Sequence, residues 1–299
     1  NNFLLLLLLS AIWGSAFFAI KIGVETINPI SVASIRLIIA AVILYIYFKT
    51  KKIYSNLDFK DIILIFIIGL IGNFIPFSLI SWAEIYIKSN TAGLLLSVAP
   101  IFTLILSHFM TKDDKFTIIK FISIIIGLFG VILIFGFDSI INFNISHNNF
   151  IPKIAIICAA LGYVLSSIFA YNLKHIDTIT LTTYVTIFAA FISLPFLIFV
   201  ELNSASKFNS SNLLALIYLG IFPTALAFLI RFYIISKAGP IFLSYVAYLI
   251  PAFAIIWGYI FLNEVIDLTT FIGVLLVLLG VFVGNKISMK KISKDGIQN

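Results

Sequence analysis

A row of polar side chains interrupts one of the most apolar stretches of this sequence. Asn73, Phe77, Ser81, Glu84 and Lys88 follow one another at steps of 4, 4, 3 and 4 residues, which places them on one face of a helix. An amide, a hydroxyl and a carboxylate on one face can bind a small polar solute, but they do not form a nucleophile and its base. The chemistry that this spacing predicts is therefore binding rather than catalysis.

Polar and aromatic residues recur in the same way in other apolar stretches. Ser97 lies in one of them, and Ser244 and Tyr248 are one helical turn apart in another. Together such positions predict a central pocket with aromatic walls, although small residues also permit close helix packing. The predicted substrate-binding residues are Trp13, Asn73, Phe77, Ser81, Trp82, Glu84, Ser97, Arg231, Ser244 and Tyr248.

Ionisable residues inside apolar stretches are costly in a membrane, so each is a candidate for function. Glu84 is the predicted proton-binding or ammonium-binding group, and Arg231 could contact a carboxylate on a substrate. Lys21 and Arg36, like Glu84, lie towards one end of their stretches. For these two residues we expect ion pairing or placement of the charge at the membrane interface, with contact to substrate as the alternative.

Two prolines, Pro100 and Pro251, lie near the middle of apolar stretches. Each lacks an N–H group, so the carbonyl four residues earlier, on Leu96 or Ala247, loses its helical hydrogen bond. In a membrane such a carbonyl must face protein or a water-filled cavity. We therefore predict that both prolines are hinges beside the pocket, with an ordinary packing kink as the alternative.

Several classes of function are excluded by what the sequence lacks. It has no Gly-x-x-x-x-Gly-Lys-[Ser/Thr] segment for a nucleotide-driven pump and no Gly-x-Ser-x-Gly segment for a hydrolase. The histidines, His108, His147 and His175, lack the spacing of metal ligands, and the single cysteine, Cys158, cannot form an intrachain disulfide. We predict a protein that is not an enzyme and that uses no cofactor or metal.

The elements that must position these residues are membrane-spanning helices. The chain is 62% hydrophobic and 10% charged, whereas soluble domains carry roughly 25% charged residues. Backbone polar groups in hydrocarbon must be satisfied within a helix, and a span needs about 20 apolar residues. The sequence therefore predicts an all-α membrane protein with ten transmembrane helices, at 3–24, 30–48, 62–83, 90–110, 116–135, 152–173, 178–200, 212–234, 240–262 and 268–285.

The lysines distinguish the two sides of the membrane. Twelve lie in the tail and in alternate loops, from Lys49 to Lys294, and three lie in the remaining loops, at Lys88, Lys153 and Lys207. Because basic residues favour the cytoplasmic side, we expect a multi-pass protein of the inner cell membrane with both termini in the cytoplasm. The net charge of +7 is explained in this way without a nucleic-acid partner.

One pattern occurs twice and indicates two repeats. Pro100 precedes Asp113 by 13 residues, and Pro251 precedes Glu264 by the same interval, 151 residues further on. Five spans per repeat make the second repeat enter the membrane from the opposite side, an arrangement typical of secondary transporters. The expected division is a first five-helix repeat at 1–140, a second at 151–286 and a basic cytoplasmic tail at 287–299.

Acidic residues close the repeated pattern and stand before helices. A carboxylate is favoured at the N-terminus of a helix by the exposed amides and the helix dipole. We therefore expect structural roles for Asp113 and Glu264 at the helix hairpins, and we expect Asp114 and Asp267 to cap the fifth and tenth helices.

Two segments carry motifs of a known family. They are residues 12–40, with Trp13-Gly14-Ser15, Lys21, Pro29 and Arg36, and residues 244–280, with Tyr248-Leu249-Ile250-Pro251, Gly258, Glu264, Gly273 and Gly280. With the paired proline-to-acid pattern, they resemble the EamA family of the drug/metabolite transporter superfamily. The chain departs from the family at Asp113, where Glu is usual, and at Leu161-Gly162, where the second repeat lacks the Trp-Gly opening. The resemblance implies ten helices and the transport of small metabolites, with substrates that differ widely across the family.

Three functions follow as hypotheses. The first is a permease that exports an amino acid or a related metabolite by alternating access between two inverted repeats. The second is uptake or facilitated exchange of another solute, cationic or sugar-linked, because aromatic walls also suit a cation. The third is a membrane scaffold that transports nothing. The expected partners are a small-molecule substrate and the lipid bilayer, while proton coupling and a homodimer stay open.

Overall fold

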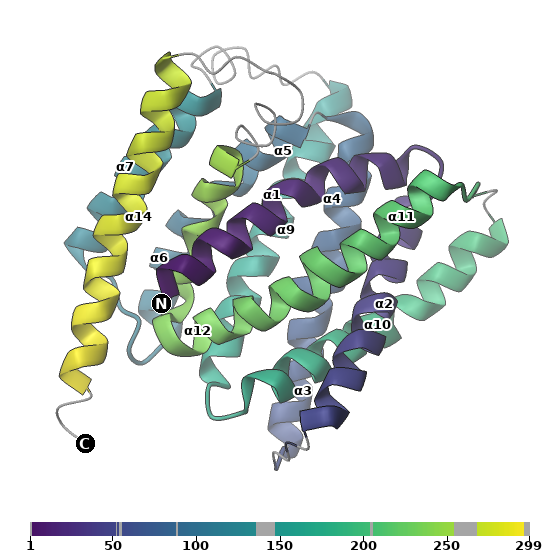
Figure 1. Cartoon of the computed structure of the whole chain (residues 1–299), viewed down its shortest axis with the longest axis horizontal. Helices are drawn as coiled ribbons and strands as arrows, with labels where there is room; N and C mark the ends of the chain where they lie inside the picture. Colours follow the sequence, from purple (N-terminus) through teal and green to yellow (C-terminus); the bar gives the residue numbers. More distant parts are fainter. Residues whose placement is uncertain are drawn as a thin grey trace.

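The computed structural model describes residues 2–51, 53, 56–87, 89–135, 147–203, 206–253 and 268–295. Within these ranges all regular structure is helical, as the apolar runs predict (Figure 1). Two short π-helical turns, η1 (Leu70–Phe74) and η2 (Gly220–Leu226), interrupt longer helices. The α-helices are α1 (Asn2–Val24), α2 (Pro29–Lys51), α3 (Phe59–Gly69), α4 (Ile75–Tyr86), α5 (Ser89–Leu96), α6 (Ala99–Met110), α7 (Ile118–Phe135), α9 (His147–Asn172), α10 (Thr178–Asn203), α11 (Ser210–Leu219), α12 (Ala227–Ser244) and α14 (Leu268–Asp295).

The helical segments agree with the ten predicted spans. Seven are long and apolar enough to cross a membrane, and α7 and α14 contain two shorter apolar helices. The longest segment, Ser210–Ser244, holds the eighth predicted span and the first residues of the ninth, because Gly239 breaks it and Pro240 begins the next helix. Gly239 has a φ of 85°, a conformation that residues with a side chain rarely adopt. The ninth predicted span is described as far as residue 253, so Glu264 and Asp267 lie outside the described residues.

The connections between helices gather at two opposite ends of the molecule. At one end the Lys174 ammonium lies 2.8 Å from the Asp113 carboxylate, which joins the connection after α9 to the connection after α6. At the other end the Lys207 N–H donates to the Thr26 carbonyl at 3.1 Å, which joins the connections before α11 and after α1. The helices between these connections therefore pass from one end to the other, as membrane-spanning helices must.

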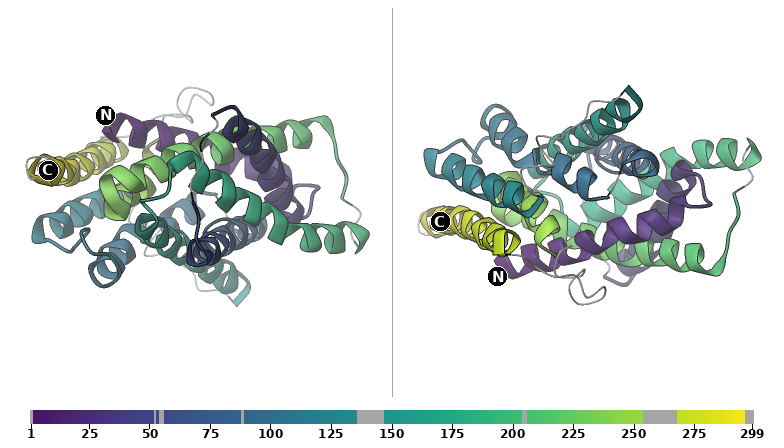
Figure 2. Two further views of the ribbon diagram at one scale, coloured as in Figure 1. Left: turned by 90° about the horizontal axis from the view of Figure 1, so that it is seen from below. Right: turned by 90° about the horizontal axis from the view of Figure 1, so that it is seen from above.

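The last helices of the two repeats, α7 and α14, lie side by side at one end of the longest axis (Figures 1 and 2). A Cβ atom on Gly273 would lie 2.8 Å from the Gly130 carbonyl oxygen, and one on Gly280 would lie 2.8 Å from the Gly127 nitrogen. Higher residue numbers on α14 thus meet lower numbers on α7, so the two helices are antiparallel.

The second helices of the two repeats, α2 and α10, are paired in the same way. The Thr183 hydroxyl donates to the Leu44 carbonyl at 3.5 Å, and the Ser31 hydroxyl donates to the Glu201 carboxylate. The start of α10 thus contacts the end of α2, and the end of α10 contacts the start of α2, so these two helices are antiparallel as well. Because each antiparallel pair consists of equivalent helices, the two repeats have opposite orientations in the membrane.

The third helix of each repeat contains a π-helical turn at the equivalent place. η1 follows Gly69 and η2 begins at Gly220, which is 151 residues later. A Cβ atom on Gly69 would lie 2.8 Å from the Val185 carbonyl oxygen of α10, and one on Gly220 would lie 3.4 Å from the Arg36 carbonyl oxygen of α2. Each π turn therefore packs closely against the second helix of the other repeat. Such turns are rare and occur frequently at functional sites.

The fourth span is broken near its middle, and the ninth span is broken closer to its start. α5 ends at Leu96 and α6 begins at Ala99, one residue before Pro100. In the second repeat the helical hydrogen-bond pattern is interrupted at Tyr245, six residues before Pro251. Both breaks lie on the side of the span that precedes the proline, where the proline removes a hydrogen bond.

Candidate substrate-binding site

A cavity of ≈ 120 Å³ is bounded by helices of both repeats. The first repeat contributes α1, α2, α4 and the break between α5 and α6, and the second contributes α9, α12 and the helical residues that follow it. Most of the wall is apolar, as is usual for a small-molecule site with a few placed polar groups. The polar, charged and aromatic residues of the wall are Trp13, Phe17, Arg36, Phe77, Thr103, Tyr163, Ser167, Arg231 and Ser244.

Arg231 on α12 is 1% exposed and is held by neutral acceptors. Its Nη2 donates to the Ser166 hydroxyl at 2.6 Å and to the Ser167 hydroxyl at 3.2 Å, and its Nη1 donates to Asn73 Oδ1 at 3.4 Å. Both serine hydroxyls in turn donate to the Tyr163 carbonyl, which leaves their lone pairs directed at the guanidinium. These contacts fix Arg231 in the wall of the cavity without neutralising its charge.

Arg36 on α2 is the second buried cation of the wall, at 2% exposure. Its Nε donates to the Thr224 hydroxyl of η2 at 3.0 Å, and its guanidinium carbon lies 3.8 Å from the centre of the Phe77 ring. The expectation that Arg36 forms an ion pair or reaches the interface is therefore wrong. Its side chain is held in the cavity wall by the Thr224 hydroxyl, 188 positions away in the sequence, and by the face of the Phe77 ring.

The wall carries positive charge with no negative partner among the described residues. The ion pairs in the described ranges are Lys120–Asp114, Lys174–Asp113 and His175–Asp61, and no Asp or Glu is among the residues that line the cavity. Two buried guanidinium groups beside a mostly apolar cavity are costly unless an anion accompanies them. This arrangement can bind an oxyanion group of a small molecule.

The sequence matches the EamA-like transporter family over residues 2–136 and again over residues 152–285. The chain belongs to this family. The relatives of this EamA-like transporter include the "Uncharacterized transporter YoaV" of Bacillus subtilis (strain 168), 24% identical over 272 residues, which are 91% of this chain and 92% of the relative. An "Uncharacterized transporter" of Archaeoglobus fulgidus is 29% identical over 285 residues, which are 95% of this chain and 98% of the relative.

A solved structure shares the fold. It is a crystal structure of a protein that is 15% identical in sequence, with a TM-score of 0.79 over 96% of this chain and 98% of that one. Together with the family match and the apolar helices, it describes a multi-pass membrane transporter with two inverted five-helix repeats.

Four of the residues predicted to bind substrate line the cavity of this EamA-like transporter: Trp13, Phe77, Arg231 and Ser244. Trp13 lies on α1, where its indole N–H donates to the Pro223 carbonyl of η2 at 3.0 Å. Phe77 lies one turn after η1 on α4 and packs against the ring of Phe228 at 5.8 Å between centroids. The aromatic side chain that α4 presents to the cavity is thus supported from behind by the third helix of the other repeat.

The other predicted residues, Asn73, Ser81, Trp82, Glu84, Ser97 and Tyr248, are not part of the wall. Asn73 acts on the cavity indirectly, since its amide oxygen accepts from Arg231. Glu84 is fully buried beside Lys21, whose ammonium donates to the Glu84 carbonyl at 2.7 Å. Tyr248 packs against α7, where its ring atom Cδ2 lies 2.5 Å from the place of a Cβ on Gly127. Whether any of them meets substrate in another conformation stays a prediction.

Arg36, Thr103, Tyr163 and Ser167 line the cavity but were not among the predicted binding residues. The sequence did mark Arg36 as a candidate for function, because a charged residue inside an apolar span is costly in a membrane. For Tyr163 and Ser167 the signal was their spacing of four residues on the sixth span, which gives a polar face like that of the third span.

The residues around the two predicted hinges face the cavity. Leu96 and Ala247, whose carbonyls receive no N–H from Pro100 and Pro251, both line it. Ala99 and Ile250, which directly precede the prolines, line it as well. The two breaks thus lie against the cavity from opposite repeats.

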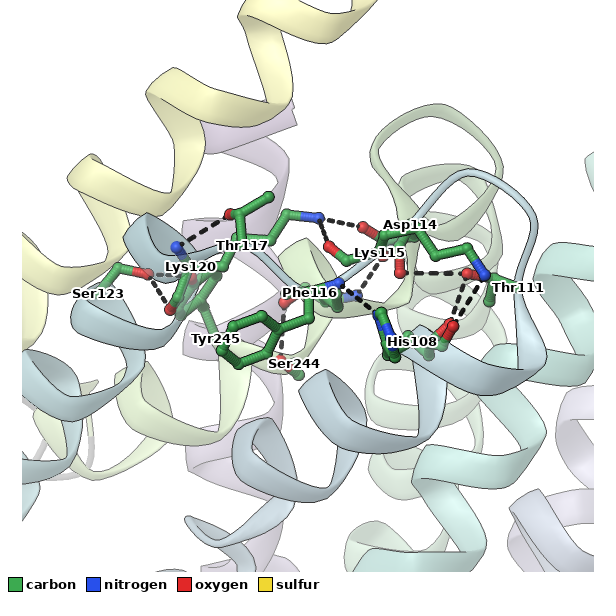
Figure 3. Close-up of polar contacts among 12 residues, drawn as sticks. His108, Thr111, Asp114, Lys115, Phe116, Thr117, Lys120, Ser123, Ser244 and Tyr245 are labelled. Atoms are coloured by element: carbon green, nitrogen blue, oxygen red, sulfur yellow. Dashed lines mark hydrogen bonds and ion pairs between the residues drawn. The ribbon is translucent and has the colours of Figure 1, made fainter.

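A second polar cluster lies at one end of the fold, where the connection after α6 meets the start of the ninth span (Figure 3). Asp114 is 7% exposed; its Oδ1 lies 2.6 Å from the Lys120 ammonium, and its Oδ2 accepts the Ile241 N–H at 2.9 Å. Nearby, the Ser123 hydroxyl of α7 shares a hydrogen bond with the Tyr245 hydroxyl. The contacts of Asp114 with Ile241 and of Ser123 with Tyr245 join the first repeat to the second.

This cluster corrects the role that the sequence suggested for Asp114. α7 begins at Ile118, and the Thr117 hydroxyl, not Asp114, accepts a backbone N–H of its first turn, that of Lys120. Asp114 instead accepts from the first turn of the ninth span, where it also lies close to Gly239. A carboxylate at a helix N-terminus is favourable in either place, so the sequence identified the interaction but not the helix.

Proposed function

We propose that this EamA-like transporter is a secondary transporter that moves a small polar metabolite through the cavity by alternating access. Its specific form, suggested by the family resemblance, is export of an amino acid or a related metabolite from the cytoplasm. The observation that carries the proposal is a buried, charged cavity bounded by both inverted repeats. Inverted repeats allow one central site to open to each side in turn, because the two halves can exchange conformations.

The proposed movement uses the broken helices. Pro100 and Pro251 act as hinges about which the third and fourth spans rock against the eighth and ninth. The breaks beside Leu96 and at Tyr245 supply backbone that can bend without disrupting a continuous helix. The lysine distribution supports an orientation with both termini in the cytoplasm of the inner membrane. The end that holds Asp114 and Lys120 is then the cytoplasmic end.

A scaffold without transport activity is the weaker alternative. Such a protein requires only a packed centre, and its folding is impaired by buried charges that serve no ligand. Arg36 and Arg231 are both nearly inaccessible and both line the cavity. Their burial is understandable in a protein whose cavity is filled by substrate during part of a cycle.

Exchange in proteoliposomes tests the proposal. The purified transporter is reconstituted with an unlabelled mixture of amino acids and organic acids inside, and uptake of each labelled solute is measured by counterflow. We expect at least one solute to exchange, and Trp13→Ala and Ser244→Ala to slow that exchange because both residues line the cavity. A control change, Leu202→Ala, lies on an exposed position of α10 outside the cavity. Failure of every solute to exchange would contradict transport.

A further inference from the structure

The two terminal nitrogens of Arg36 have no hydrogen-bond acceptor among the described residues. The polar and ring contacts of its side chain are the hydrogen bond from Nε to Thr224 and the stacking on Phe77, and neither involves an Nη–H group as a hydrogen-bond donor. A guanidinium has five N–H donors, and buried donors without acceptors cost free energy. At 2% exposure, Arg36 can meet this need only from the cavity that it lines.

Arg231 reaches the same cavity from the opposite repeat. Its hydrogen bonds go to an amide and two hydroxyls, which orient the guanidinium and leave its full charge in place. Arg36 lies seven residues into α2 and Arg231 eight residues before Gly239. At a rise of about 1.5 Å per residue, each is roughly 10–12 Å inside its end of the fold, so both lie near the middle of the membrane.

An anion in the cavity would satisfy both observations. Arginine is the residue that best matches the planar geometry of carboxylate and phosphate groups, because its donors form a rigid fork. The described wall contributes no carboxylate to compensate the two charges, and a bound anion would supply that compensation. We infer that the substrate is a small organic acid with a net negative charge, whose oxyanion group binds Arg36 and Arg231. This inference rests on the proposed function and specifies its substrate class.

The same wall disfavours the other solute classes. A cation would meet two like charges, and the Phe77 face that could have received it is already covered by Arg36 at 3.8 Å. A zwitterion without net charge would compensate only one of the two guanidinium groups, so among amino acids the described wall favours those with an acidic side chain. The remaining aromatic surface, from Trp13, Phe17 and Tyr163, suits the carbon skeleton of the acid.

Matched acid and amide ligands test this inference on the unmodified protein. Thermal unfolding of the purified transporter is followed with glutamate against glutamine, succinate against succinamide, and glycerol 3-phosphate against glycerol. A ligand that binds only the folded protein raises the unfolding temperature. We expect at least one acid to stabilise the protein and to compete in counterflow about tenfold better than its neutral counterpart, because the amide or alcohol leaves a guanidinium unpaired.

Arginine variants test the residues themselves. Arg36→Gln and Arg231→Gln are expected to lower exchange of the acid by about a hundredfold each, whereas Arg36→Lys and Arg231→Lys retain charge and recover part of it. Lys174→Gln is the control, because it removes one positive charge from an exposed pair at the end of the fold. The glutamine variants should also lose the thermal stabilisation by acid.

The outcomes separate the two proposals. If neutral or cationic solutes exchange as well as or better than every acid, or if no acid stabilises the unmodified protein, the inference is wrong and transport can still hold. If exchange of the acid survives both arginine-to-glutamine changes, the assigned residues are wrong. If no solute of any class exchanges, the proposed function itself fails. Should the variants not fold, the acid–amide comparison on the unmodified protein decides.

Discussion

Two buried groups of charges in this transporter have opposite designs. Arg36 and Arg231 line the cavity with only neutral partners, whereas Lys120 lies 2.6 Å from the carboxylate of Asp114 at the end of the fold. The second group is complete, since Asp114 also accepts a backbone N–H from Ile241. The first group is incomplete in the described residues, because positive charge is present without its counterion.

The difference indicates that the Asp114–Lys120 pair stabilises the fold and that Arg36 and Arg231 bind a ligand. A neutralised pair that joins the connection after α6 to the start of the ninth span holds two elements of different repeats together. An unneutralised pair in a cavity stabilises nothing by itself, so its burial makes sense only when a ligand arrives. Changes to Asp114 and Lys120 should therefore alter stability, and changes to Arg36 and Arg231 should alter transport.

The largest expected effect on stability belongs to Asp114→Asn. This change leaves Lys120 buried without a carboxylate and should lower the free energy of unfolding by about 3–5 kcal/mol. Denaturant unfolding in detergent measures the loss. The double change with Lys120→Met removes the stranded charge and should recover most of it. If the single variant were as stable as the unmodified protein, Asp114 would not stabilise the fold, and the proposed difference between the two groups of charges would be wrong.

Gly72→Ala should have an intermediate effect on stability and also slow transport. A Cβ atom at this position of η1 would overlap the Cβ atom and the hydroxyl of Ser166, and that hydroxyl accepts a hydrogen bond from Arg231. Overpacking of this kind costs about 1–3 kcal/mol. Combining it with Ser166→Gly removes the clash and should restore stability while transport stays reduced. If transport and stability recovered together, the Ser166 contact would not position Arg231.

Arg231→Met should leave stability nearly unchanged while exchange is lost. Replacing a buried charge by an apolar side chain of similar length removes a desolvation cost and three hydrogen bonds to neutral groups, and such exchanges are often neutral or stabilising, so we expect a change within about 1 kcal/mol. Unfolding measured without any organic acid present tests this. A loss as large as that of Asp114→Asn would show that Arg231 serves the fold.

The exposed pair of Lys174 and Asp113 should matter least. Its hydrogen bond with Asp113 raises the pKa of Lys174 above the usual value of 10.5, so the pair stabilises the protein at neutral pH and loses its contribution as the pH rises past that value. The Lys174 side chain is 46% exposed, and pairs of this kind contribute about 0–1 kcal/mol. Lys174→Met should shift the unfolding temperature slightly at about pH 7 and not at about pH 11.5, where most of the charge is gone in both proteins. An equal shift at both pH values would mean that lost packing, not charge, is responsible.

The sequence was most informative where structure depends on local pattern. Runs of apolar residues predict the spans because each helix satisfies its own backbone in lipid, and the prolines mark the broken spans for the same reason. Arg231, Trp13, Phe77 and Ser244 could be identified because polar or aromatic residues on a span face must meet something other than lipid.

The placement of Arg36 and the π turns could not be predicted in this way. Arg36 owes its position to Thr224, a partner from the other repeat, and no local pattern contains that information. The stripe from Asn73 to Lys88 assumed an unbroken α-helix, but η1 includes Asn73 and ends at Phe74. Its wider turn rotates Asn73 relative to the residues of α4. On α4 itself only Phe77 of the predicted stripe lines the cavity, next to Ile80, and Lys88 lies outside the described residues.

The unneutralised arginines have a consequence for energetics under voltage. A full elementary charge that crosses the membrane field changes the free energy by roughly 2.3 kcal/mol per 100 mV. If the cavity is positively charged when empty and less so when an acid fills it, a negative cell interior attracts the empty form more strongly than the loaded one. The electrical gradient then acts on the return of the empty carrier. Transient currents on a supported membrane should appear without substrate and shrink when acid is added, and electrically silent empty carriers would contradict this.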